Sequence, residues 1–239
     1  MNKLLTIIIP AYNEAERIGN TLDKYLEFYQ EKNIEFLIVL NGCTDDTLSI
    51  VNKFKEEHPD RIRIINIKEA IGKGGAVREG FNHSKADFIG YLDADGSTSP
   101  EEFKKIIDGI EGIDGTIASR WKKGSKIVGA NLLREIVSIS FISFVKLLFF
   151  MPFIDTQCGA KIFKKEVIKD VLASLEINNM SFDVELLFRI HQAGYKVKEI
   201  PTIWIDNSDS SAALGTPLNL LKTGFNMFIT LIKIRFRKI

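Results

Sequence analysis

Short apolar runs alternate with amphipathic segments along the first half of this chain, and this alternation limits what it can fold into. The apolar runs are five to seven residues long, which is typical of buried strands, and the segments between them carry apolar residues at helical spacing. Strands that alternate with helices predict an α/β fold with a mostly parallel sheet and helices on both faces. The expected strands are residues 4–9, 35–40, 61–67, 87–92 and 115–119, and the expected helices are residues 14–30, 46–57, 74–85 and 100–109.

The composition is that of an ordinary globular protein and argues against several classes of function. The formal net charge of the 239 residues is +1, so the sequence does not favour a nucleic-acid partner. Two cysteines and three histidines exclude a disulfide framework and argue against a zinc site. The apolar run near the N-terminus ends at Pro10 and is too short for a secretory signal, which predicts a cytoplasmic location.

Two later segments predict contact with a membrane surface. Residues 136–154 contain Lys146 as their only charge, and Pro152 interrupts their end. A span needs about 20 apolar residues, so an interfacial helix at about 129–154 is favoured over a spanning helix or a buried core helix. After Asp209 the chain has five basic residues and no acidic one, with apolar residues at helical spacing. We expect a domain over 1–211 and a basic amphipathic tail over 212–239, attached peripherally to the cytoplasmic face; packing of the tail on the domain is the alternative.

An aspartate pair follows the fourth expected strand. Ligands of such sheets bind beyond the carboxyl ends of the strands, and Asp93 and Asp95 lie directly after the apolar run that ends at Leu92. Carboxylates at positions i and i+2 of an extended chain point to the same side. Oxygen ligands without His or Cys nearby suit Mg²⁺ or Mn²⁺. The pair therefore predicts a divalent cation site, with solvated loop acids as the alternative.

A glycine-rich loop precedes the third expected helix. The sequence GKGG over residues 72–75 carries Lys73, and its glycines would let backbone amides approach an anion at a helix N-terminus. The loop is neither a Walker motif nor a dinucleotide fingerprint, because Val77 stands where the last glycine of that fingerprint would be. It predicts a phosphate-binding loop, and a plain tight turn is the alternative.

The motifs together resemble family 2 of the glycosyltransferases, which has the Rossmann-like GT-A fold. The sequences IIIPAYNE and LDADG and the pair Ser119-Arg120 carry the resemblance to the family. The sequences GKGGAVREG, DTQCGAKIF and FDVELLFRIHQAGYKVKEIP are similar to the branch of dolichyl-phosphate glucosyltransferases and polyprenyl-phosphate sugar synthases. The resemblance runs from about Leu4 to Trp204, with the motifs in the expected order.

The resemblance implies a role for each of several residues. The base and ribose of a nucleotide sugar would contact Pro10, Tyr12, Glu14 and Asn41. The diphosphate would be bound through a divalent cation on Asp93 and Asp95, with Lys73 and Gly74 lining the nucleotide pocket. The acceptor side would be formed by Arg120, Arg134 and Lys161, facing the acceptor phosphate, and by Asp183 and Glu185, closing the site. The sequence VLNGCTDD departs from the VDDGS usual in the family, which leaves the nucleotide base open.

The implied activity is that of a metal-dependent, inverting glycosyltransferase. It would move a sugar from UDP-glucose or GDP-mannose to a polyprenyl or dolichyl phosphate. A lipid monophosphate is already a dianion at neutral pH, because its second pKa is about 6, so it needs cations to place it and no general base. One alternative is a hydroxyl acceptor on a soluble glycan or protein, with Asp183 or Glu185 as base. Another is a non-catalytic nucleotide-binding protein at the membrane surface. The oligomeric state stays open.

Overall fold

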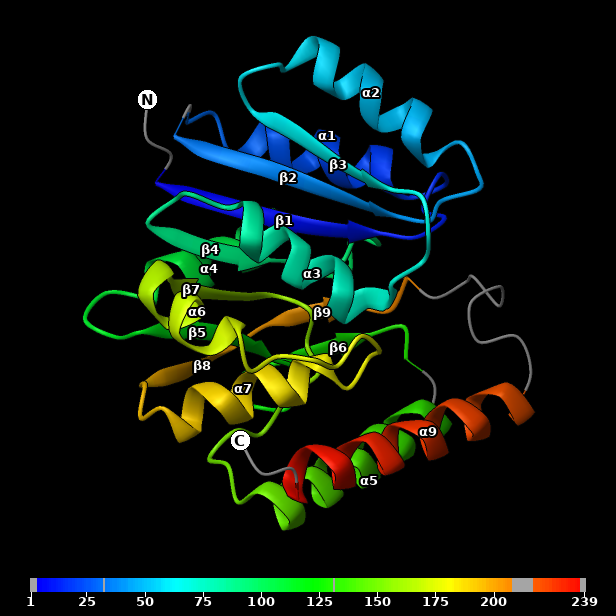
Figure 1. Ribbon diagram of the computed structural model, residues 1–239, viewed down its shortest axis with the longest axis vertical. Coiled ribbons are helices and arrows are strands. Elements are labelled where there is room, and N and C mark those ends of the chain that lie inside the picture. Colours follow the sequence, from blue (N-terminus) through cyan, green and yellow to red (C-terminus); the bar gives the residue numbers. More distant parts are fainter. Residues whose placement is uncertain (1–3, 32, 131, 208–216, 237–239) are drawn as a thin grey trace.

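A seven-stranded sheet with helices on both faces forms the body of the molecule (Figure 1). The computed structural model describes residues 4–31, 33–130, 132–207 and 217–236, and the side chains of 132–134 and 217–225 lie outside the description. The strands of the main sheet are β1 (Leu5–Ala11), β2 (Ile34–Asn41), β3 (Ile62–Ile67), β4 (Phe88–Tyr91), β5 (Gly115–Ser119), β7 (Lys161–Lys164) and β8 (Val197–Pro201). The short strands β6 (Lys126–Val128) and β9 (Ile203–Ile205) pair with each other in parallel.

The helices follow the expected alternation and then continue beyond it. They are α1 (Ile18–Phe28), α2 (Thr47–Glu57), α3 (Gly72–His83), α4 (Pro100–Asp108), α5 (Leu132–Phe149), α6 (Lys165–Leu172), α7 (Phe182–Gln192) and α9 (Pro217–Phe236). The sequence predictions for β1 to β5 and α1 to α4 are confirmed, and the largest error is at the start of α1. Residues 14–17 lie outside the helix: the amides of Glu14 and Ala15 donate to the side chains of Thr47 and Asp45 near the start of α2, and the amide of Arg17 closes a turn on the carbonyl of Glu14.

The sheet order is β3-β2-β1-β4-β7-β5-β8. Strand β7 is antiparallel to both of its neighbours, and all other pairs are parallel. This confirms the predicted mostly parallel α/β fold. The carboxyl ends of six strands therefore lie at one edge of the sheet, and the antiparallel β7 begins at that same edge.

The two faces of the sheet have separate hydrophobic cores, which follow from the two-residue period of a strand. On β1, Ile7 and Ile9 pack on the side of α1, α2 and α4, whereas Ile8 packs on the side of α3, α6 and α7. All three isoleucines are fully buried. Because both faces of β1 are covered, its sequence is a continuous apolar run rather than an alternating one.

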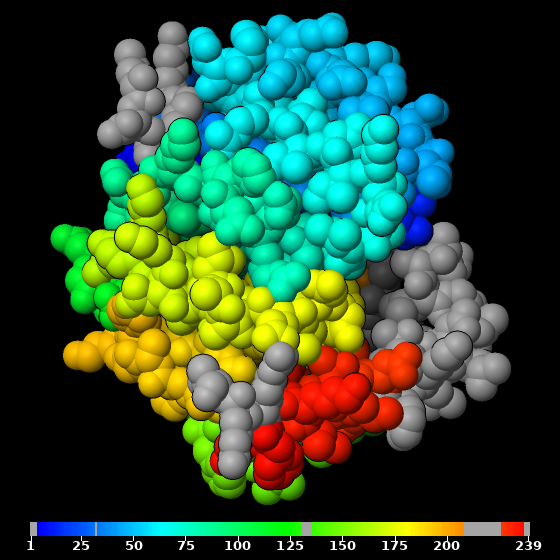
Figure 2. Space-filling view, viewed as in Figure 1, coloured from blue at the N-terminus to red at the C-terminus, as the bar shows by residue number. Residues whose placement is uncertain are grey.

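Helices α5 and α9 lie side by side below the sheet (Figure 1). The rings of Phe144 and Phe228 join them, with centroids 4.5 Å apart, and Phe149 packs on Phe188 of α7. Figure 2 shows α9, coloured red, beside the yellow segment that contains α7. No helix among the described residues is long and apolar enough to cross a membrane. The predicted domain boundary at residue 211 lies outside the described residues.

Candidate active site

The loops that follow β1 and β2 are tied to each other at the carboxyl edge of the sheet. Asn13, whose φ is +53°, accepts a hydrogen bond from the amide of Thr44 at 2.8 Å. The carboxylate of Asp45 accepts one from the amide of Ala15 at 3.0 Å, and the amide of Glu14 donates to the hydroxyl of Thr47 at 2.8 Å. This part of the edge is therefore held in shape by the protein alone, as a preorganised binding site requires.

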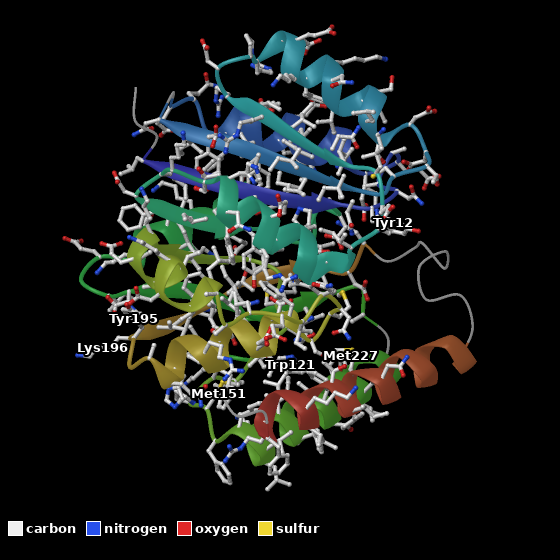
Figure 3. The ribbon with its side chains drawn as sticks, viewed as in Figure 1. Tyr12, Trp121, Met151, Tyr195, Lys196 and Met227 are labelled. Carbon is white, nitrogen blue, oxygen red and sulfur yellow. The ribbon has the colours of Figure 1, made fainter. Side chains whose placement is uncertain are left out.

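Of the four residues expected at the base and ribose, Tyr12 is the most open. It is 54% exposed and stands at the end of β1 (Figure 3). Pro10 is half-buried within β1, and the carboxamide oxygen of the buried Asn41 accepts the amide of Ile71 at 2.7 Å. Asn41 thus fixes the entry to α3, a role that the sequence did not reveal.

Glu14 lies in the same region with an unusual pKa. Burial raises the pKa of its carboxyl to about 7, although an ion pair with Arg17 at 2.5 Å opposes this shift. The negative charges of Asp95 and Asp93 raise it further, which means that the three carboxyl groups share one electrostatic environment.

Asp93 and Asp95 follow β4 directly, as predicted. Asp95 accepts the amide of Ser97 at 2.9 Å, and its pKa is raised by burial and then by the charge of Asp93. The described residues contain no group of three or more His, Cys, Asp or Glu side chains that could hold a metal ion. Two acidic oxygen donors with like charges fit a cation such as Mg²⁺ or Mn²⁺, which keeps water and phosphate oxygens as its other ligands.

The carboxylate of Asp93 packs against Gly159, in the turn that leads into β7. A Cβ atom at Gly159 would lie 1.8 Å from Oδ2 of Asp93, so only glycine leaves room for this carboxylate. This contact joins positions 66 residues apart in the sequence. The motif DTQCGAKIF includes Gly159, but the contact itself follows from the pairing of β4 with β7.

A buried cluster of charges adjoins Asp93. The ammonium of Lys73 lies 2.7 Å from Oδ1 of Asp93 and 3.4 Å from Oδ2 of Asp183. Oδ1 of Asp183 accepts bonds from Lys161 and from the hydroxyl of Tyr91, both at 2.5 Å. Burial alone would raise the pKa of Asp183, but the two lysines hold it below its ordinary value.

The expectation that Lys161 faces an acceptor phosphate is wrong. Its side chain is fully buried, and its ammonium is bonded to Asp183 and to the carbonyl of Cys158. The free thiol of Cys158 is buried too, and burial raises its pKa to about 12. Such a thiol is almost entirely protonated at neutral pH and is a poor nucleophile.

The glycines at the start of α3 pack closely against the segment that precedes α7. The amide of Gly74 donates to the carbonyl of Asn178 at 2.8 Å, and a Cβ at Gly74 would lie 2.3 Å from the carbonyl oxygen of Ile177. Gly72 has a φ of +76° and meets the same segment. The Gly74 amide is therefore occupied by a neighbouring loop, and the place of Gly74 in the nucleotide pocket stays a prediction.

Arg120 is held in a bidentate ion pair with Asp155. Its Nε and Nη2 atoms donate to the two carboxylate oxygens at 2.7 and 2.9 Å, and its backbone amide donates at 2.9 Å. The Arg120 side chain keeps 15% of its surface exposed, whereas Asp155 is fully buried. Burial would raise the pKa of Asp155, but Arg120 holds it below its ordinary value. The sequence indicated Arg120 and missed this partner.

Glu185 and Arg134 are the two remaining predicted residues. The carboxylate of Glu185 is buried and accepts the amides of Glu176 and Ile177 at 3.0 and 2.8 Å, so it shapes the loop that covers the start of α3. Arg134 belongs to the first turn of α5, but its side chain lies outside the described residues.

Comparison with known proteins supports the resemblance to family 2 of the glycosyltransferases. The family described as glycosyl transferase family 2 matches residues 6–172. The dolichyl-phosphate beta-glucosyltransferase of Dictyostelium discoideum is 30% identical over 99% of this chain and 75% of its own length. The Saccharomyces cerevisiae protein of the same name is 30% identical over 88% of this chain and 69% of its own length.

Solved structures with low sequence identity share the fold. The mannosyltransferase PcManGT of Pyrobaculum calidifontis, in complex with GDP-Man and Mn²⁺, has a TM-score of 0.69 at 18% identity and covers 98% of this chain and 65% of its own. Glucosyl-3-phosphoglycerate synthase of Mycobacterium tuberculosis, with Mn²⁺, UDP and phosphoglyceric acid, has a TM-score of 0.70 at 15% identity, with 99% and 80% covered. The fold is thus the GT-A fold of glycosyltransferases. Given the family match over most of its length, this chain is an enzyme of glycosyl transferase family 2.

Proposed function

We propose that this enzyme transfers a sugar, with inversion, from a nucleotide sugar to a polyprenyl or dolichyl phosphate, in a reaction that depends on Mg²⁺ or Mn²⁺. UDP-glucose is the first candidate donor, because curated relatives are named glucosyltransferases, and GDP-mannose is the second. The observation that carries the proposal is the Asp93–Asp95 pair at the carboxyl edge of the sheet, with the ammonium of Lys73 paired to Asp93 and the guanidinium of Arg120 within the electrostatic influence of Asp93.

The donor side of this proposal rests on Tyr12 and the aspartate pair. The exposed ring of Tyr12 is suited to contact a nucleotide base, and Glu14 follows it two residues later in the same loop. Asp93 and Asp95 would hold the divalent cation, which when bound neutralises charge on the departing diphosphate. Lys73 places a further positive charge next to Asp93. Removing a single electrostatic contact of this kind costs ~3–4 kcal/mol in the barrier.

The acceptor side favours a phosphate over a hydroxyl group. A hydroxyl acceptor needs a general base, but Asp183 is buried among two lysines with a lowered pKa, and Glu185 is occupied by two amides. A phosphate dianion needs no base. The side chain of Arg120 keeps 15% of its surface exposed while Asp155 fixes the direction of its guanidinium, which suits it to orient an anion.

The surface of α5 and α9 supports a peripheral position at a membrane, with the enzyme on the cytoplasmic face. More than half of the exposed large apolar side chains among the described residues belong to these helices or directly follow α5. They are Ile136, Val137, Ile139, Leu147, Phe150, Ile229, Ile232 and Phe236. Exposed Lys146 and Lys233 lie on the same two helices, and each basic residue near an anionic lipid surface contributes ~1 kcal/mol.

The activity is tested by incubating the full chain with Mg²⁺ or Mn²⁺, a polyprenyl phosphate, and UDP-glucose or GDP-mannose in separate reactions. The readout is sugar in the organic phase. Asp95→Asn is expected to abolish transfer. Asp87→Asn is the matched control, because Asp87 is exposed just before the opposite end of β4. If nucleotide binds but neither donor yields lipid-linked sugar, the phosphate acceptor is wrong and a hydroxyl acceptor replaces it. Failure to bind any nucleotide favours the non-catalytic alternative.

The membrane proposal has its own test. Leu147→Glu combined with Phe150→Glu is expected to lower co-sedimentation with vesicles containing anionic lipid, since these side chains are 72% and 75% exposed. Leu4→Glu, at a residue 45% exposed just before β1, is the control and is expected to bind vesicles like the unchanged protein. Equal retention of both variants would contradict membrane contact through α5.

A further inference from the structure

Lys73 lies between two carboxylates that belong to different parts of the site. Its side chain is only 12% exposed, and its ammonium is closer to Asp93, at 2.7 Å, than to Asp183, at 3.4 Å. Asp93 is one of the two proposed cation ligands, whereas Asp183 belongs to the first turn of α7 and is not a proposed ligand. The ammonium therefore neutralises a group that a divalent cation would also use.

Asp183 is a fixed partner. Lys161 and Tyr91 both bond to its Oδ1 atom, and the whole side chain is buried. Its Oδ2 atom is also buried and accepts no hydrogen bond from the described residues, so Lys73 at 3.4 Å is its ion-pair partner. A small rotation about the terminal carbon–carbon bonds of the Lys73 side chain would shorten this contact and satisfy the orphaned oxygen. Lys73 can therefore leave Asp93 without becoming an unpaired buried charge.

Asp93 is, by contrast, the more accessible of the two carboxylates. It keeps 32% of its side-chain surface exposed, and Gly159 supports it from behind. A dication that approaches Asp93 meets the ammonium of Lys73 and is repelled by it. A nucleoside diphosphate that approaches the same place is attracted by the ammonium.

We propose that Lys73 is a positioning residue that exchanges partners when substrate binds. In the enzyme without nucleotide its ammonium pairs with Asp93 and opposes the metal there. When a nucleoside diphosphate enters, the ammonium turns to the diphosphate while Asp183 holds it, and Asp93 is released to the divalent cation. Metal and nucleotide then each raise the affinity for the other by the same factor. This inference rests on the proposed function, because it takes Asp93 and Asp95 as the cation ligands.

The test measures Mn²⁺ binding to the full chain by the electron paramagnetic resonance signal of free Mn²⁺, first without nucleotide and then with UDP or GDP. Lys73→Gln removes the charge but keeps a donor near Asp93 and Asp183, and Lys73→Arg keeps the charge. Without nucleotide, Lys73→Gln is expected to bind Mn²⁺ about tenfold more tightly than the unchanged protein, and Lys73→Arg is not. In the unchanged protein and in Lys73→Arg, nucleotide is expected to raise the affinity for Mn²⁺. In Lys73→Gln this increase is expected to be smaller.

Controls separate this inference from the proposed function. Lys53→Gln, on the exposed surface of α2, removes the same charge away from the site and is expected to leave Mn²⁺ binding unchanged. Circular dichroism and the Tm establish that each variant is folded. Mn²⁺ binding that needs Asp95 but is the same or weaker in folded Lys73→Gln overturns the partner exchange alone. Mn²⁺ binding that Asp95→Asn does not weaken overturns the metal site, and the exchange with it.

Discussion

The ion pair of Arg120 and Asp155 allows a stability prediction whose size follows from its burial. Asp155 is fully buried and accepts five N–H groups, three from Arg120 and one each from the amides of Gln157 and Cys158. The substitution Asp155→Asn removes the charge and leaves the largely buried guanidinium without its counter-ion. Breaking a buried pair in this way lowers the free energy of unfolding by ~3–5 kcal/mol. For a chain of this size, the Tm should fall by roughly 6 to 20 °C.

The assay is urea unfolding followed by fluorescence and circular dichroism, with differential scanning calorimetry for the Tm. Asp108→Asn is the matched control, because Asp108 pairs with Lys104 at an exposed site where side chains are 60% and 51% accessible. Such surface pairs contribute ~0–1 kcal/mol. The reasoning is refuted if Asp155→Asn costs no more than Asp108→Asn. The double variant Arg120→Met with Asp155→Asn should recover part of the loss, since no isolated charge remains buried and the amide oxygen can still accept a backbone N–H group.

The same pair predicts a dependence on pH. Arg120 holds the pKa of Asp155 below its ordinary value in the folded state, whereas in the unfolded chain it is ~3.9. The stabilisation is therefore fully present above that value and is lost as the pH falls toward the folded-state pKa. Unfolding measured from pH 7 to pH 2 should show the gap between the unchanged protein and Asp155→Asn narrowing below about pH 4. A constant gap across this range would contradict the assignment.

Two further outcomes follow from close packing at the site. Gly159→Ala would place a Cβ 1.8 Å from Oδ2 of Asp93, so Mn²⁺-dependent nucleotide binding, measured by calorimetry, should weaken about tenfold or more. Gly19→Ala is the control and should bind normally, because its Cβ would have its nearest neighbour at 3.7 Å. In the native protein Ellman's reagent should modify the half-buried Cys43 and spare the buried Cys158. Both thiols should react once the protein is unfolded in guanidinium. Rapid labelling of Cys158 in the native protein would contradict its burial.

Local pattern was sufficient to predict the first half of the fold. The strands and helices up to Ser119 follow from apolar periodicity, since each is short and bounded by polar or glycine residues. The sequence did not predict β7 as an antiparallel strand. Its four residues, Lys161–Lys164, carry no pattern that gives direction, and their place between β4 and β5 is determined by pairing across the whole chain.

The sequence predicted which residues form the site better than it predicted the contacts that these residues make. Asp93, Asp95, Lys73 and Arg120 gather at or beside the carboxyl edge, as the motifs indicated. The buried ion pair of Lys161 with Asp183 was not predicted, because a lysine in a polar motif is expected to be exposed unless its partner is known. Such partners lie far away along the chain, and a single sequence holds no local signal for them.

The antiparallel strand β7 also has a consequence for the order in which the chain can assemble. Among the described strands, β5 and β8 join the rest of the main sheet only through β7. The first four strands can pair with one another as soon as they are made, but β5 must wait until a segment more than forty residues later inserts beside it. Contacts between residues so far apart in sequence are slow to form. The last part of the sheet to close is thus also the part that brings Gly159 against Asp93, so the chain cannot complete its catalytic edge before its topology is complete.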